Sequence, residues 1–221
     1  MNLPPTDRAG APGGSPHDAA DDTALLASIL ALALPPGADP ADAARALLAR
    51  FGTIGAVFAA DPAELASAVA GRLQIRVIVP LLREAAIRLM RARIRQGDLL
   101  SCHDALMAYL QASLARDTVE QFRVLFLDRG TRLIADEVLA QGTIDQTPVY
   151  PREVMRRAIQ LKASELILVH NHPGWNPTPS REDIAMTRRL AQIATVLGLT
   201  VRDHVIVGNG ASISFRQAGL L

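Results

Sequence analysis

Downstream of residue 99, short apolar runs alternate with helical segments, and this alternation restricts the folds open to the chain. Residues 122–127 (FRVLFL) favour a strand, and residues 128–130 (Asp-Arg-Gly) predict a turn into a second strand near Leu133. Strands mixed with helices in this order predict an α+β or three-layer α/β domain of roughly 120 residues. Further predicted strands lie at residues 166–169, 201–207 and near Ile213, and predicted helices at residues 101–115, 151–162 and 181–197.

Residues 22–98 carry a different pattern, rich in Ala, Leu and Arg and with the punctuation of helices. The Asp-Pro pairs at residues 39–40 and 61–62 each predict a helix N-cap followed by proline at the first helical position. Gly52 lies where the C-terminus of a helix is expected. The pattern predicts a small bundle of about four or five short helices, the last and longest at residues 80–96.

These shifts of pattern divide the chain into three parts. Residues 1–21 are rich in proline and glycine and offer almost no side chain to bury, so we expect a disordered tail. Residues 22–98 are the expected helical domain, and the Gly-Asp pair at residues 97–98 is the expected boundary. Residues 99–221 are the expected α+β domain, and the apolar share of 49% is high enough for a real core.

Composition argues against several classes of protein. Lys plus Arg number 23 against 22 Asp plus Glu, so a formal net charge of +1 gives no general attraction to nucleic acid or to an anionic membrane. Aromatic residues make up 4%, which argues against a stacking platform for single-stranded nucleic acid. No segment reaches the roughly 18 apolar residues that a membrane span requires.

Two further features of the sequence indicate the cellular compartment. Residues 24–34 (ALLASILALAL) have the apolar character of a secretory signal core, but Asp18, Asp21 and Asp22 precede them where a signal carries positive charge. A buried helix is therefore the favoured interpretation. Cys102 is the single cysteine, which excludes an intrachain disulfide and an all-cysteine zinc site. An unpaired thiol is typical of a reducing compartment, so we expect a cytoplasmic protein.

The chemically informative stretch is HNHPGWNPTPSRED at residues 170–183. His170 and His172 lie two residues apart at the end of a predicted strand, so both imidazoles point to one face, where they can converge on one metal ion. Ser180 is a natural N-cap for the following helix, and Asp183 in its first turn can complete a His-His-Asp set. Three protein ligands plus water are the pattern of a catalytic zinc site.

Each half of this stretch also has a simpler interpretation. An H-x-H pair alone is weak evidence for a metal site, and Ser180-x-x-Asp183 alone is more often a helix cap whose carboxylate the helix dipole favours. Two histidines and a carboxylate also describe the facial triad of Fe(II) oxygenases, although such sites need room for a cosubstrate. The two halves joined by a seven-residue, proline-rich loop are more specific than either half alone.

The spacing H-x-H, seven residues, S-x-x-D resembles the signature of JAMM-type (MPN/JAB domain) zinc metalloproteases. Residues 99–221 resemble the bacterial RadC family, and the helical part resembles it only weakly. One departure falls inside the motif, where Gly174-Trp175 replaces the family's usual Ser-Gly after His-Pro and leaves every ligand position intact. The stretches that carry the resemblance are Thr-Pro-Ser-Arg-Glu-Asp at residues 178–183, Asp-His-Val-Ile-Val-Gly at 203–208, Leu-Phe-Leu-Asp at 125–128 and Gly-Thr-Ile-Asp at 142–145.

By this resemblance, His170, His172 and Asp183 are the ligands of one Zn²⁺ ion per chain, in a domain whose mixed β-sheet is flanked by helices. The resemblance also implies Glu120, just before the first core strand, as the general base. It implies Ser180 as a hydrogen-bonding group of the active site that steadies the oxyanion. Composition alone leaves Glu120 as one of many carboxylates, equally a solvated residue at the end of a strand.

Two functions of different classes follow. The metal motif implies a zinc metalloprotease of JAMM type, a hydrolase that cleaves a peptide or isopeptide bond of a peptide or protein substrate through metal-activated water. The alternative is a non-enzymatic RadC-type protein associated with DNA repair and recombination, whose metal site is mainly structural. A ligand set with an open side and a candidate base favours the hydrolase.

The arginines bear on the second function. Arg88, Arg91 and Arg95 fall on one helix face, which is more typical of a solvated face but permits weak contact with DNA phosphates. RadC relatives commonly carry a helix-hairpin-helix-like Gly-x-Gly turn in this region. The matching residues 71–77 lack the second glycine, which argues against a DNA-binding module. His204, in a late predicted strand, is expected to be a core residue or a neighbour of the metal ligands.

Overall fold

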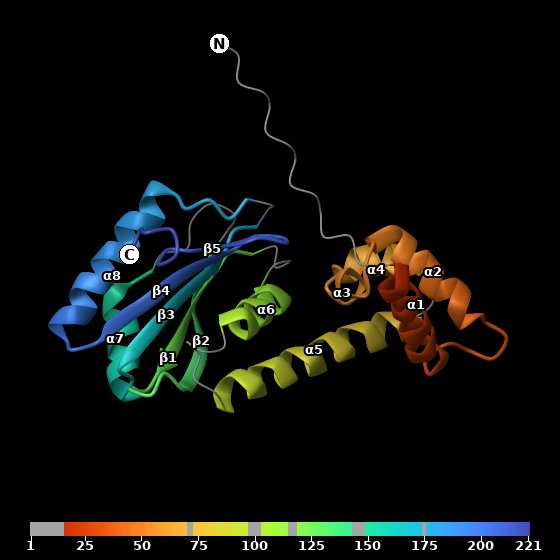
Figure 1. The fold of residues 1–221 in the computed structure, drawn as a ribbon, viewed down its shortest axis with the longest axis horizontal. Coiled ribbons are helices and arrows are strands. Elements are labelled where there is room, and N and C mark those ends of the chain that lie inside the picture. Colours follow the sequence, from red (N-terminus) through yellow and green to blue (C-terminus); the bar gives the residue numbers. More distant parts are fainter. Residues whose placement is uncertain (1–15, 70–72, 97–102, 115–118, 143–148, 174–175) are drawn as a thin grey trace, which may run out of the picture. The chain divides into compact units, whose positions relative to one another are not determined.

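The structure, a computed structural model shown in Figure 1, contains helices and one five-stranded mixed sheet, which is an α+β fold of the predicted kind. The chain divides into two compact units, which meet in the sequence between Leu82 and Arg83. The residues that the structure describes are 16–69, 73–96, 103–114, 119–142, 149–173 and 176–221.

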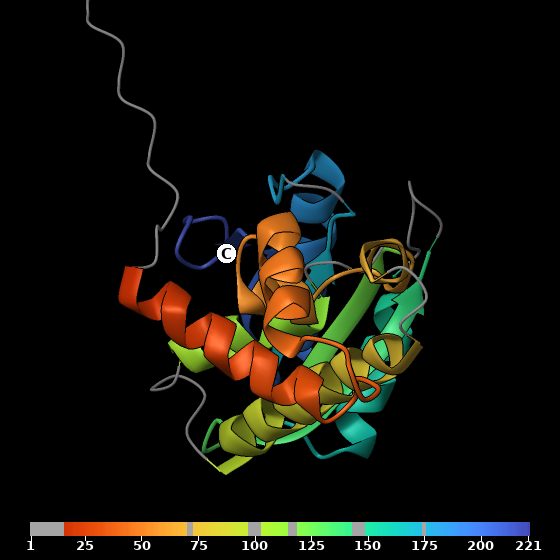
Figure 2. The same ribbon diagram turned by 90° about the vertical axis from the view of Figure 1, so that its right-hand side faces the viewer.

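The first unit is a bundle of helices. These are α1 (Pro16–Ala31), α2 (Pro40–Phe51), α3 (Ile54–Phe58), α4 (Pro62–Ala68) and the first part of α5 (Leu73–Gln96). Helices α1 and α2, coloured red and orange in Figure 2, pack against each other. The core closes around Leu30, Leu47 and Val57, which come from three different helices and are almost completely buried.

The predicted helix punctuation is confirmed at three places. The carboxylates of Asp39 and Asp61 accept hydrogen bonds from the backbone N–H groups of Ala41 and Ala63, at 2.8 and 2.7 Å. Each aspartate precedes a proline in the first turn, where the missing N–H costs no helix bond. Gly52 ends α2 with a φ of 87°, a conformation that a residue with a Cβ rarely adopts.

Helix α1 begins earlier than the sequence pattern predicts. It starts at Pro16, inside the expected tail of residues 1–21, and proline is favoured at the first position of a helix. Residues 1–15 of that tail lie outside the described residues. Leu26 and Leu30 have no exposed surface, so the buried interpretation of this apolar stretch is confirmed for them. Within the described part of the chain, no helix has both the length and the apolar character needed to cross a bilayer.

Helix α5 also begins earlier than predicted, at Leu73 rather than near Pro80. Pro80 therefore lies inside the helix, where it removes one backbone hydrogen bond. Ile75 and Val79 lie one turn apart and are buried in the core of the first unit. Burial of these two side chains offsets the lost bond and lets the helix continue through the proline.

The division between the units falls inside α5 rather than at the expected boundary, residues 97–98, which lie outside the described residues. Ile94 is buried in the core of the second unit, and Ile87 packs against that core. The last turns of α5 therefore belong to the second unit, because their apolar face has its partners there.

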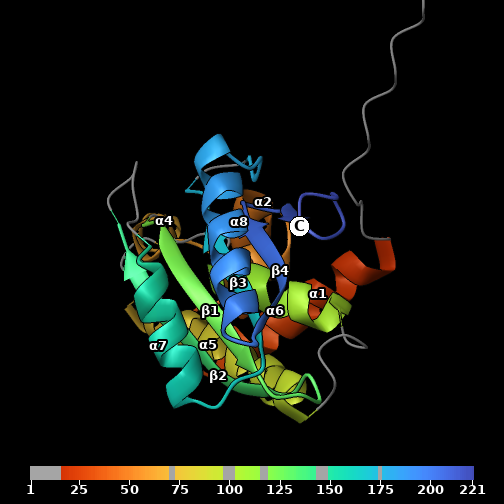
Figure 3. The ribbon, with the colours of Figure 1, turned by 90° about the vertical axis from the view of Figure 1, so that its left-hand side faces the viewer.

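The second unit has three layers. Its elements are α6 (His103–Leu114), β1 (Gln121–Leu127), β2 (Leu133–Gln141), α7 (Pro151–Gln160), β3 (Glu165–Asn171), α8 (Arg181–Val196), β4 (Thr200–Val207) and β5 (Ser212–Ser214). The sheet has the order β2-β1-β3-β4-β5, in which the β3–β4 pair is parallel and the β1–β2, β1–β3 and β4–β5 pairs are antiparallel. Helix α6 and the end of α5 cover one face, whereas α7 and α8 cover the other (Figure 3).

Strand β1 shows how side chains divide between the two faces. Phe122, Val124 and Phe126 pack on the α7/α8 side, and Leu125 and Leu127 pack on the α6 side. This alternation is the period-2 geometry of a strand. All residues of β3 are buried, as expected for a central strand covered on both faces.

A β-bulge in β4 decides which face its later side chains reach. Leu166 pairs with Val201, but Leu168 pairs with His204, so β4 advances one residue more than β3 between the two pairs. After the bulge, His204 shares the α7/α8 face with Leu168. Without the extra residue His204 would point to the α6 face, because a one-residue shift exchanges the two faces.

The core on the α7/α8 side predicts the cost of truncating its side chains. Phe126→Ala should lower the free energy of unfolding by about 3–5 kcal/mol, because it leaves a cavity between the sheet and the helices. Val138→Ala on the edge strand β2, where Val138 is exposed, should cost less than about 1 kcal/mol and is the matched control. Urea unfolding followed by circular dichroism measures both, and equal losses in the two variants would contradict this layer arrangement.

Candidate metal centre

Two histidines at the end of β3 bring their imidazole nitrogens together. The Nε2 atoms of His170 and His172 are 2.9 Å apart. The backbone N–H of His172 donates to the carbonyl of Val207 at 3.0 Å, so pairing with β4 continues past the end of β3 and carries the second ring. The predicted convergence of the two rings on one side of the strand is thus present.

The third side chain comes from the first turn of α8. Asp183 Oδ1 lies 3.3 Å from Nε2 of His170, and Asp183 Oδ2 lies 3.5 Å from Nε2 of His172. Ser180 is the N-cap of α8 and forms a capping box with Asp183, which turns the carboxylate back towards the helix start. Among the described residues, His170, His172 and Asp183 are the one group of three side chains arranged to hold a metal ion.

The donor set fits a divalent transition metal ion. With ligand bonds of about 2.0–2.1 Å, tetrahedral donors around zinc lie about 3.3 Å from one another. The separations of 2.9, 3.3 and 3.5 Å in this cluster bracket that value. Two imidazoles and one carboxylate suit zinc and also suit iron(II). The cluster is therefore compatible with a metal site of the JAB type.

Burial and charge set the protonation of the three groups. Burial lowers the pKa of His170 to about 4, against the opposing charge of Asp183. The hydrogen bond with Asp183 raises the pKa of His172. Burial alone would raise the pKa of Asp183, but the hydrogen bond with His172, the charge of His170 and the hydrogen bonds from Ser180 hold it well below its usual range. His170 and Asp183 therefore suit a cation directly, whereas a protonated His172 must first release its proton.

Ser180 is hydrogen-bonded to Asp183 in both directions. Its hydroxyl donates to Asp183 Oδ2 at 2.7 Å and accepts from the backbone N–H of Asp183 at 3.0 Å. The backbone N–H of Ser180 donates to the same Oδ2 at 2.8 Å. The helix-cap interpretation is therefore confirmed, and the donation of this hydroxyl to an oxyanion stays a prediction.

Glu120 lies directly before β1 and is partly buried, and its charge contributes to the raised pKa of His172. Asn171, between the two histidines, holds the backbone on both sides of Glu120. Its Oδ1 accepts from the N–H of Gln121 at 2.9 Å, and its Nδ2 donates to the carbonyl of Val119 at 3.0 Å. The alternation of β3 thus sends the two histidines towards Asp183 and the intervening asparagine to the segment that carries Glu120.

His204 was expected in the core or beside the candidate ligands, and it is buried and lies against His170. Thr187 also belongs to this group, although it was not singled out from the sequence. His204 Nε2 lies 2.8 Å from His170 Nδ1, and His204 Nδ1 lies 2.6 Å from Thr187 Oγ1. The Thr187 hydroxyl also donates to the backbone carbonyl of Asp183 at 2.6 Å. The signal that points to Thr187 is its spacing of one helical turn after Asp183, which sets both on one helix face.

The arginines considered for DNA contact are in part engaged within the second unit. Arg91 donates to a backbone carbonyl of β2 at 3.2 Å. Arg88 pairs with Glu84 at 2.7 Å on the surface. The side chain of Arg95 lies outside the described residues, and contact with DNA through these arginines stays a prediction. Other residues considered in the sequence that lie outside the described residues are Cys102, Gly174, Trp175, residues 71–72 of the stretch matched to the Gly-x-Gly turn, and residues 143–145 of the Gly-Thr-Ile-Asp stretch.

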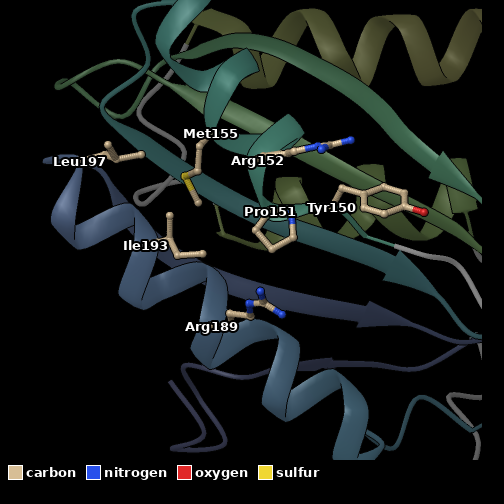
Figure 4. Close-up of a pocket in the computed structure, with 7 residues that line it drawn as sticks. All are labelled: Tyr150, Pro151, Arg152, Met155, Arg189, Ile193 and Leu197. Carbon is tan, nitrogen blue, oxygen red and sulfur yellow. The ribbon is translucent and has the colours of Figure 1, made fainter.

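A surface pocket of about 510 Å³ lies between α7 and α8 (Figure 4). None of His170, His172 and Asp183 lines it. Arg189 is the lining residue of α8 nearest in sequence to Asp183, six residues later and thus about 9 Å along the helix axis. The pocket therefore extends along α8 away from the cluster. Its lining residues are Tyr150, Pro151, Arg152, Met155, Arg189, Ile193 and Leu197.

Comparisons with known proteins agree with this geometry. Residues 100–220 match the family model of the RadC-like JAB domain. The chain is 48% identical over 204 residues to the UPF0758 protein of Rhodobacter capsulatus, covering 92% of this chain and 95% of that protein. It is 44% identical over 200 residues to the UPF0758 protein SPO0054 of Ruegeria pomeroyi, covering 90% of this chain and 89% of that protein. The similarity therefore extends through the helical unit as well.

The cluster predicts one bound divalent ion per chain. Titration of chelator-treated protein with Zn²⁺, followed by calorimetry, should give a stoichiometry near one. His172→Ala should weaken binding by more than about 100-fold, because even residues behind metal ligands contribute about 10–100-fold. The control is His103→Ala, which removes a histidine that contacts Gln217 instead. Unchanged affinity in His172→Ala would show that the ion binds elsewhere.

Proposed function

Since the chain belongs to the RadC family and carries its JAB-type domain, we propose that it is a metal-dependent hydrolase that cleaves a peptide or isopeptide bond. The observation that carries the proposal is the convergence of His170, His172 and Asp183, with ligand atoms within 4.8 Å of one another. Three protein donors leave a coordination position for water, which distinguishes a catalytic site from a closed structural one.

We propose one Zn²⁺ ion per chain at this cluster. When bound there, zinc supplies a Lewis acid that lowers the pKa of a water molecule to about 7 and polarises the scissile carbonyl. His170 and His172 would hold the ion through Nε2, and Asp183 would hold it through a carboxylate oxygen. The partial burial of Asp183 limits competing hydration of the ligand atoms, since its side chain is 14% exposed.

Glu120 is the proposed general base. Its carboxylate accepts a proton from the attacking water and returns that proton to the leaving amine. Two features support the assignment: the charge of Glu120 contributes to the raised pKa of His172 after the larger effect of Asp183, and Asn171 fixes the backbone on either side of Glu120. A base must be held within hydrogen-bond reach of its proton, and a clamped backbone limits the positions that the side chain can take.

Ser180 has two proposed parts in the site. It holds Asp183 through its hydroxyl and its backbone N–H. If the hydroxyl turns towards substrate, the backbone N–H still holds the carboxylate, and the hydroxyl is free to donate to the carbonyl oxygen as negative charge develops on it. Ser180 is exposed, so its hydroxyl has room to rotate towards substrate.

The proposed base predicts a loss of turnover without a loss of metal. Glu120→Gln should retain bound zinc and lower the rate of peptide-library cleavage by at least about 100-fold, because general base catalysis typically contributes 10²–10⁴-fold. Glu84→Gln is the control, since Glu84 is an exposed carboxylate of the same unit that pairs with Arg88. Cleavage is followed by mass spectrometry, with metal content measured on the same samples. Full activity in Glu120→Gln would refute the assignment of the base.

Removal of the metal distinguishes a catalytic role of the site from a purely structural role. Chelation should abolish library cleavage, and zinc should restore it, while circular dichroism shows the second unit still folded. The sheet has its own core on both faces, so folding does not depend on the ion alone. If chelation unfolds the second unit, and the protein also shows no cleavage before chelation, the metal acts as a structural element.

Asn171 predicts a second effect on turnover. Asn171→Ala should reduce the cleavage rate and leave zinc affinity within about threefold, because the lost hydrogen bonds hold the Glu120 segment and not the ligands. The same calorimetric titration and the same cleavage assay measure both quantities. A parallel loss of zinc affinity and turnover would instead mean that Asn171 supports the whole end of β3.

A further inference from the structure

A series of buried hydrogen bonds leads from His170, on the side of its ring away from His172 and Asp183, into α8. His170 Nδ1 lies 2.8 Å from Nε2 of His204, and His204 Nδ1 lies 2.6 Å from the hydroxyl of Thr187. The Thr187 hydroxyl lies 2.6 Å from the backbone carbonyl of Asp183. The series thus begins at one clustered ligand and ends on the backbone of another.

The positions of the protons follow from what each group can do. A carbonyl only accepts, so the single hydroxyl proton of Thr187 is donated to the carbonyl of Asp183. The Thr187 oxygen must then accept the proton on Nδ1 of His204. A neutral His204 with its proton on Nδ1 has a lone pair on Nε2, which accepts from Nδ1–H of His170. The Nε2 atom of His170, which faces His172 and Asp183, is left with its lone pair.

The surroundings of His204 favour its neutral form. The ring is completely buried, and its centroid lies 4.5 Å from that of Phe215 and 6.3 Å from that of Phe122. His170 and Thr187, both uncharged donors or acceptors here, are its two side-chain hydrogen-bond partners in the described part of the chain. A buried imidazolium without a hydrogen-bonded carboxylate is costly, so His204 has one proton to place rather than two.

The ring of His204 is also fixed from its backbone. Asp203 Oδ1 accepts from the N–H of His204 at 2.7 Å and from the N–H of Arg216 at 3.0 Å. The carbonyl of His204 accepts from the N–H of Phe215 at 2.9 Å. These bonds hold the segment just after the β4 bulge, which is what turns His204 towards His170 rather than towards α6.

We propose that Thr187 and His204 are positioning residues that hold His170 in the tautomer protonated at Nδ1, with the Nε2 lone pair directed at the metal position. The inference rests on the proposed role of His170 as a metal ligand. A lone pair on Nε2 faces the carboxylate of Asp183 at 3.3 Å, an arrangement that a cation between them stabilises. Fixing the tautomer before the ion arrives removes one of the costs of binding it.

The Thr187 hydroxyl decides which atom donates in each of these hydrogen bonds. Thr187→Val keeps the shape of the side chain but has no oxygen to accept from His204. The proton of His204 is then no longer fixed on Nδ1, and the reverse arrangement, with the proton of His170 on Nε2, becomes available. Thr187→Ser keeps the hydroxyl and should keep the same donors.

The test is the tautomer of His170 in metal-free protein, read from two-bond ¹H–¹⁵N correlations of histidine-labelled samples. The wild type and Thr187→Ser should show His170 protonated at Nδ1, and Thr187→Val should show a mixture of tautomers. Zn²⁺ affinity, measured by competition with a chromophoric chelator, should fall by about 10–100-fold in Thr187→Val and stay near the wild-type value in Thr187→Ser.

Thr195→Val is the matched control, because Thr195 makes the same hydroxyl bond to a carbonyl four residues earlier in α8, that of Ala191 at 2.9 Å. It should leave both the tautomer and the affinity unchanged. A wild-type His170 protonated at Nε2 would overturn the proposal even if Thr187→Val fails to fold. So would wild-type affinity in Thr187→Val. Neither readout requires turnover, so absence of hydrolysis with the predicted tautomer would count against the proposed function alone.

Discussion

The arrangement depends most on the central strand β3, which is held by hydrogen bonds to β1 on one side and β4 on the other. Because both neighbours fix its register, β3 cannot shift by one residue without exchanging its two faces. That constraint sends His170 towards Asp183 of α8 and Asn171 towards the segment before β1. A single strand thus supplies the proposed ligands and the clamp for the proposed base.

Helix α8 supplies the other half of the site through its first turns. The capping box that stabilises its N-terminus also fixes the Asp183 carboxylate beside the two imidazoles. One turn later, Thr187 joins the same helix to His204 and so to His170. Local helix stability and the geometry of the proposed metal site therefore rest on the same residues, and a change that weakens the cap also moves a proposed ligand.

Much of this was accessible from the sequence because it is local. The strands, the helix caps at Asp39 and Asp61, and the convergence of the two histidines with Asp183 follow from period, capping and spacing. The early start of α5 was not accessible, because Pro80 signals a helix start locally, whereas burial of Ile75 and Val79 in the core of the first unit extends the helix to residues before the proline. Partners across elements were also hidden from the sequence. The β4 bulge that aims His204 appears only once β3 and β4 pair, and the Thr187 hydroxyl meets His204 only once α8 packs on the sheet.

Zinc K-edge X-ray absorption of the zinc-loaded protein is the most direct test of the proposed metal site, because it reports the atoms bound to the ion. If His170, His172 and Asp183 bind the ion, the spectrum should show a four-coordinate ion with two imidazole nitrogens and two oxygens at about 2.0–2.1 Å, one oxygen from Asp183 and one from water. Loss of one imidazole from the spectrum in His170→Ala would assign the shell to this cluster. A shell of oxygens alone, a sulfur ligand, or a fourth protein donor in place of water would contradict it.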